Sequence, residues 1–145
     1  MRAGSLLRGS ATAWLLGKPA EDQDFSARRF RPAQYLHKSV LLLLNDLSEA
    51  EPSVLVLLNG PSIGEVSGTE LVFGGASVFD SFADGVIEVT DEARPLRAQG
   101  SVVFRPGVLQ RLVELGALEV VSGVALREVL AAPASERWQT AGGTV

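Results

Sequence analysis

Two apolar runs that follow each other closely constrain this chain more than any other part of its sequence. The first spans Val40 to Leu44 and the second spans Val54 to Leu58, and every residue in both is aliphatic. A short acidic linker that ends at Pro52 separates them. Sequence this apolar is stable only when it is removed from water. We therefore expect the stretch from Pro32 to Gly60 to form the core.

The first part of this stretch predicts a helix from Pro32 to Leu47. Pro32 suits a first helical position, because its missing N–H would be unpaired there in any case. Apolar residues then recur with a helical period at four positions: Leu36, Val40, Leu43 and Leu47. In such a helix Leu41 and Leu42 would point to a second side. We expect that side to be covered by the same domain or by a neighbouring subunit.

The rest of the chain predicts short strands, turns and one further helix. Strand patterns occur at 53–58, 69–73, 76–79, 86–90, 101–104, 118–121 and 124–130, and the last of these also fits a helix. Loops are predicted at 61–68 and 91–100, with a turn at 80–85. The further helix would begin near Pro106 and end at Gly116, which suits a left-handed C-terminal cap. This order predicts a single compact α+β domain with a mostly antiparallel or mixed sheet and two packed helices.

Charge divides the chain into segments. Residues 1–32 carry six basic and three acidic side chains, whereas residues 33–145 carry seven basic and fourteen acidic ones. We expect an extended basic N-terminal arm at 1–31, an acidic α+β core at 32–130 and a polar C-terminal tail at 131–145. An acidic body repels phosphate, which argues against nucleic acid as a partner.

Composition limits the classes of protein that fit. The chain has 145 residues and no cysteine, which predicts one domain without disulfides, thiolate metal sites or thiol catalysis. No apolar run approaches the roughly 20 residues that span a bilayer. We expect a soluble protein, in the cytoplasm or within a particle. The arginine-rich and serine-rich arm also fits a transit peptide, which leaves an organelle-imported subunit as an alternative.

One motif suggests catalysis. Gly60 to Gly64 fits the G-x-S-x-G pattern of a hydrolase, with Ser62 as the nucleophile. Such a nucleophile needs a helix directly after it, and a strand pattern follows here. The single histidine, His37, precedes Ser62, whereas the hydrolase order places it last. We therefore expect Ser62 to lie in a plain loop.

Metal and cofactor motifs are also missing from the sequence. His37 has no second histidine or cysteine with which to share a metal. The acidic residues around the predicted turn, Asp80, Asp84 and Glu88, lack the spacing of a calcium loop. We expect no metal site and no cofactor, and the sequence favours a protein that is not an enzyme.

These observations favour a non-catalytic assembly protein that forms a homo-oligomer or a larger complex, such as a shell or virion-type particle, through its N-terminal arm. Its partners would be other copies of itself or subunits of that assembly. The predicted interface joins apolar and basic residues of the arm, the second side of the first helix and the tail: Trp14, Leu15, Leu16, Arg28, Arg29, Arg31, Leu41, Leu42 and Trp138.

Besides the organelle-imported subunit, a second alternative stays open. A small-molecule-binding or hydrolytic α+β domain would place a pocket between sheet and helices, with polar groups such as Ser62, Asp80 or Asp91 around it.

Overall fold

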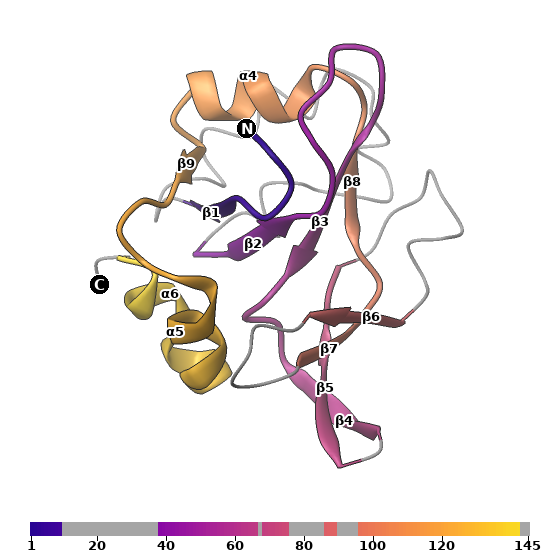
Figure 1. Ribbon diagram of the computed structural model, residues 1–145, viewed down its shortest axis with the longest axis vertical. Helices are drawn as coiled ribbons and strands as arrows, with labels where there is room; N and C mark the ends of the chain where they lie inside the picture. Colours follow the sequence, from indigo (N-terminus) through magenta and orange to yellow (C-terminus); the bar gives the residue numbers. More distant parts are fainter. Residues whose placement is uncertain (10–37, 67, 76–85, 90–95, 143–145) are drawn as a thin grey trace.

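Two sheets and a few short helices make up the fold (Figure 1). The computed structural model describes residues 1–9, 38–66, 68–75, 86–89 and 96–142. The first sheet has five antiparallel strands in the spatial order β8 (Val102–Phe104), β3 (Ser53–Leu57), β2 (Val40–Leu43), β1 (Leu6–Gly9) and β9 (Leu118–Val120).

The second sheet has four strands in the order β4 (Ser62–Val66), β5 (Thr69–Phe73), β7 (Leu96–Gln99) and β6 (Val86–Val89). Strands β5 and β7 are parallel, and the other neighbours are antiparallel. The described helices are α4 (Val108–Glu114), α5 (Leu126–Ala131), the 3₁₀ turn η2 (Ala134–Glu136) and α6 (Arg137–Thr140). The predicted α+β class, with antiparallel and mixed sheets, is confirmed.

The five-stranded sheet is the middle layer, and both of its faces are buried. Side chains alternate along each strand, so successive residues point to opposite faces. One set packs with α4: Leu7, Leu41, Leu43, Leu55 and Leu57. The other set packs with the second sheet and the C-terminal helices: Leu6, Val40, Leu42, Val56 and Leu58. Figure 1 shows α4 on one side of this sheet, with α5, α6 and the second sheet on the other.

The predicted helix at 32–47 is wrong over its described part, because Val40–Leu43 is the strand β2. Every residue of β2 is buried, so the aliphatic run fits a strand covered on two faces as well as it fits a buried helix. Strands β1 and β3 pair with β2 on its two sides and take its backbone hydrogen bonds. Residues 32–37 lie outside the described part of the chain.

Two asparagine side chains close the ends of the β2–β3 pair. At the end of β2 that leads into the linker to β3, Asn45 donates to the carbonyl of Pro52 at 2.9 Å and accepts from the amide of Val54 at 2.9 Å. At the other end, Asn59 accepts from the amide of Val40 at 2.9 Å and donates to the carbonyl of Lys38 at 2.8 Å. The side-chain amide of each asparagine therefore takes the place of a backbone partner for the hydrogen-bonding groups at that end of the pair.

Described segments near both ends of the chain contribute to the core. Strand β1 comes from the predicted arm and lies between β2 and β9. The predicted tail forms η2 and α6, and Trp138 of α6 is 7% exposed. Leu6 and Leu7 form too short an apolar run to be recognised as a strand, and Trp138 is the only large aromatic or leucine-sized apolar residue in the sequence of the tail. Residues 10–31 lie outside the described part.

Other predictions have mixed outcomes. Strands at 53–58, 69–73, 86–90, 101–104 and 118–121 are confirmed within a residue or two, as β3, β5, β6, β8 and β9. The predicted loops at 61–68 and 91–100 are wrong where described, since they contain β4 and β7. Segment 124–130 is the helix α5 and not a strand. The turn at 80–85 and the strand at 76–79 lie outside the described residues.

The cap predicted at Gly116 is confirmed. Gly116 has φ +78°, which favours glycine, and its amide donates to the carbonyl of Val113 at 3.1 Å. The next amide, of Ala117, donates to the carbonyl of Leu112 at 3.0 Å. These two bonds are the Schellman motif. Leu112 and Ala117 are both buried, which adds the hydrophobic contact that often accompanies this helix end.

The two sheets meet at Gly74. Its carbonyl accepts from the amide of Leu57 in β3 at 2.9 Å, and its amide donates to the carbonyl of Gln99 in β7 at 2.8 Å. A Cβ at this position would collide with the carbonyl oxygen of Gly100 and would lie 2.8 Å from the Cβ of Ala98. The close approach of the two backbones therefore requires glycine.

The described residues include no helix that is long and apolar enough to cross a membrane.

We predict that Gly74→Ala lowers the free energy of unfolding by about 3 kcal/mol, because two backbones would have to separate. The control is Gly64→Ala, where φ is +145° but a Cβ meets no atom within 4 Å. That change should cost about 1 kcal/mol, from backbone strain alone. Urea unfolding of both variants measures the difference, and equal losses would contradict a steric requirement at Gly74.

Candidate ligand-binding cleft

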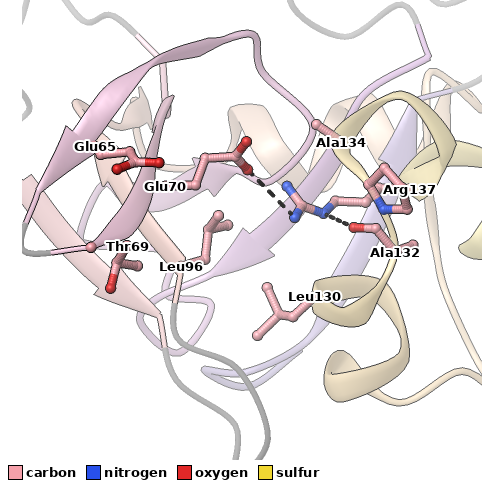
Figure 2. A pocket seen from close by; sticks show the side chains of 10 residues that line it. Glu65, Thr69, Glu70, Leu96, Leu130, Ala132, Ala134 and Arg137 are labelled. Carbon is pink, nitrogen blue, oxygen red and sulfur yellow. Dashed lines mark hydrogen bonds and ion pairs between the residues drawn. The ribbon is translucent and has the colours of Figure 1, made fainter.

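A cleft of about 580 Å³ lies between the β4–β5 hairpin and the C-terminal helices. Figure 2 shows side chains from both walls of the cleft, the hairpin on one side and the helices on the other. Ten residues line it: Glu65, Gly68, Thr69, Glu70, Leu96, Leu130, Ala132, Pro133, Ala134 and Arg137. The cleft therefore joins residues that are more than 60 positions apart in the chain. Its volume lies within the range of roughly 300–1,000 Å³ that is usual for ligand sites.

Two carboxylates lie side by side on the hairpin side of the cleft. Glu65 of β4 and Glu70 of β5 are directly opposite each other in the antiparallel pair. Opposite residues of such a pair have Cβ atoms roughly 5 Å apart and point to the same face. Figure 2 shows both carboxylates near the same part of the cleft. Like charges in this arrangement destabilise a strand pair, unless a cation offsets them.

Arg137 is the charged group on the helix side. Its side chain is 5% exposed and is held by backbone carbonyl groups. Nε donates to the carbonyls of Val129 at 3.2 Å and Ala132 at 3.0 Å, and Nη1 donates to the carbonyl of Leu58 at 2.8 Å. These bonds connect α5 and α6 to the end of β3. They also fix the guanidinium group at the wall of the cleft.

Among the described residues that line the cleft, the balance of charge is negative, with two carboxylates and one guanidinium. Nη2 of Arg137 lies 3.9 Å from Oε1 of Glu70, which is a distant and partly exposed ion pair. Within the described part of the chain, the carboxylate of Glu65 makes no hydrogen bond and no ion pair. The arrangement suits a ligand with an ammonium or guanidinium group that contacts both glutamates.

The remaining lining is mainly apolar. Leu96 and Leu130 border the cleft but are only 2% and 1% exposed (Figure 2). The more accessible apolar groups of the lining are Ala132, Pro133 and Ala134. Thr69 adds a hydroxyl group on the hairpin side. A ligand here would place its charged end near the glutamates and an aliphatic portion against the segment 132–134.

The structure places three of the predicted interface residues in the core of the chain itself. Leu41 is fully buried beneath α4, and Leu42 is 6% exposed on the opposite face of the sheet. The Nε1 group of Trp138 donates to the carbonyl of Gly9 at 3.0 Å. These side chains are therefore used within this chain, and a contact of the same residues with a second subunit stays a prediction.

The other predicted interface residues lie outside the described part of the chain: Trp14, Leu15, Leu16, Arg28, Arg29 and Arg31. The same holds for His37, Asp80, Asp84 and Asp91. Among the arm's basic residues, Arg8 is described. It faces Glu119 across the β1–β9 pair, with Nη2 2.8 Å from the carboxylate. An attraction between the basic arm and the acidic body thus exists within one chain.

Ser62 does not form a nucleophile elbow. It lies in β4, directly opposite Val72 of β5, and no helix follows it. The described residues also contain no group of three or more histidine, aspartate or glutamate side chains that could hold a metal ion. The residues that do converge, Glu65, Glu70 and Arg137, were not singled out from the sequence. Only the spacing of the two glutamates about Gly68 offers a signal, since it fits opposite positions in a hairpin.

No protein family, no curated protein and no solved structure matches this chain. The cleft is therefore interpreted from its own geometry and charge.

We predict that Arg137→Met lowers the free energy of unfolding by about 3 kcal/mol, because it removes the donors of three buried or partly buried carbonyl groups. Arg137→Lys should recover little of this loss, since an ammonium group cannot reproduce the planar set of donors.

The control is Glu70→Gln. Its ion pair with Arg137 is 3.9 Å long and the Glu70 side chain is 46% exposed, so the change should cost less than about 1 kcal/mol. Chemical unfolding measures all three variants. If Arg137→Met and Glu70→Gln lose the same stability, the ion pair holds the helices and the carbonyl bonds do not.

Proposed function

We propose that this chain is a non-catalytic assembly protein that binds a cationic segment of a partner subunit in the cleft. The observation that carries this proposal is the pair Glu65 and Glu70, which lie directly opposite each other, with the guanidinium of Arg137 3.9 Å from Glu70 alone. An arginine or lysine side chain from a partner would supply the second cation. It would relieve the repulsion between the two carboxylates on binding.

The charge distribution of the sequence supports a second copy as the partner. Residues 1–32 have a net charge of +3, with six basic and three acidic residues, and residues 33–145 have a net charge of −7. Basic residues of one copy are therefore attracted to the acidic body of another. A larger assembly that contains a different basic subunit would use the same chemistry.

The test is the mass of the full chain in solution, measured by light scattering over a range of concentrations. The wild type should associate, and the double change Glu65→Gln, Glu70→Gln should weaken association by about tenfold or more. High salt should have a similar effect on the wild type, because partly exposed charges are screened.

A matched control removes two other glutamates. Glu49 and Glu51 are exposed and lie in the linker between β2 and β3. The changes Glu49→Gln and Glu51→Gln alter the net charge equally, and they should leave the mass unchanged. A wild type that stays monomeric at all concentrations, or equal effects of both double changes, would rule the proposal out.

A second candidate function is the binding of a small molecule that carries an amine or a guanidine. It is favoured by the volume of the cleft, about 580 Å³, together with the apolar surface of Ala132, Pro133 and Ala134 that lines the same cleft as the carboxylates. Agmatine and spermidine are suitable probes.

For this candidate we predict saturable binding of agmatine by calorimetry, weakened about tenfold by Glu65→Gln. The Glu49→Gln variant should bind as the wild type does. Binding by a chain that remains monomeric would favour the small molecule over the partner segment, and no binding to wild-type protein would exclude agmatine.

A further inference from the structure

We propose that a second pocket, around Lys38, binds a phosphate group. This pocket has a volume of about 250 Å³. Six residues line it: Lys38, Asn59, Ala134, Ser135, Trp138 and Gln139. It shares Ala134 with the larger cleft but has the opposite charge, since Lys38 is the one charged residue among the described residues of its lining. The inference is independent of the function proposed for the acidic cleft.

The backbone at Lys38 is held in an uncommon conformation. Its φ is +52°, and no other described residue except glycine has a positive φ. Such a conformation in a lysine is unfavourable by itself and persists where neighbouring groups impose it. Asn59 imposes it here, because its side chain bonds the carbonyl of Lys38 and the amide of Val40. The backbone from which the Lys38 side chain starts is therefore held in place.

The ammonium group is positioned as well. Nζ of Lys38 lies 5.1 Å from the centre of the Trp138 ring, within the range of a cation–π contact. The ring is itself fixed, because its Nε1 donates to the carbonyl of Gly9 at 3.0 Å. Within the described part of the chain, no carboxylate pairs with Lys38. A positive charge thus lies beside the pocket without an anionic partner among the described residues.

The other polar groups of the pocket suit an anion with several oxygen atoms. Lys38 offers up to three donors, Ser135 a hydroxyl and Gln139 an amide group, and the last two are exposed and accessible. The amide of Asn59 is already used by the backbone. A tetrahedral oxyanion can accept from all three remaining side chains, and a pocket of this volume accommodates one phosphate group. The group can be free inorganic phosphate or part of a larger molecule.

The test uses the full chain with Trp14→Phe, so that fluorescence reports on Trp138 alone. Inorganic phosphate and a short phosphoserine peptide are titrated separately, with chloride at equal ionic strength as the reference. We expect saturable changes with phosphate and none with chloride. Tighter binding of the peptide would identify a phosphorylated partner as the source, and tighter or equal binding of inorganic phosphate would identify the free ion.

Three variants separate the pocket from general charge. Lys38→Met should weaken phosphate binding about tenfold or more by calorimetry, and Lys38→Arg should retain most of it. Arg127→Met removes the same charge from an exposed position of α5 and should bind as the wild type does. Thermal unfolding establishes that each variant is folded.

Lack of saturable binding by the wild type would overturn the proposal. So would equal responses to phosphate and chloride, or unchanged binding by Lys38→Met. If Lys38→Met does not fold, Ser135→Ala and Gln139→Ala serve instead, and unchanged binding by both would overturn it.

Discussion

Burial of the β2–β3 pair on both faces is the constraint on which the rest of the structure depends. Leu41 and Leu55 need cover on one side, and Leu42 and Val56 need it on the other. One helix, α4, covers the first face. The second face takes the four-stranded sheet and the C-terminal helices together, and the cleft lies where these two covers meet. The candidate site is thus a result of how the second face is covered.

Buried hydrogen bonds of single side chains hold these covers in place. Arg137 connects three carbonyl groups from α5, its following loop and β3, and Trp138 reaches the carbonyl of Gly9 in β1. Each of these residues also borders a pocket, Arg137 the acidic cleft and Trp138 the basic one. The groups that fix the last helices therefore also form part of the wall of each pocket.

The sequence predicts the fold class, most strands and the end of α4, because these follow from local apolar runs and from Gly116. It does not distinguish a strand from a helix at Val40 to Leu43, since a run that is apolar at every position lacks the period of either. Leu6 and Leu7 acquire their role only by pairing with β2 and β9. The cleft depends on contacts between Glu70 and Arg137, which are 67 positions apart, and no local pattern encodes that approach.

The two asparagines at the ends of β2–β3 have a consequence for the choice of pairing. A strand with alternating apolar and polar residues fixes its register, because a slip of one residue would expose the apolar set. Strand β2 is aliphatic at every position, so a slip there exchanges one leucine face for another at little hydrophobic cost. Asn45 and Asn59 bond specific backbone groups, and a slip would break those bonds at both ends. The two asparagines therefore select one register of the β2–β3 pair, because burial of the apolar side chains alone would distinguish little between registers.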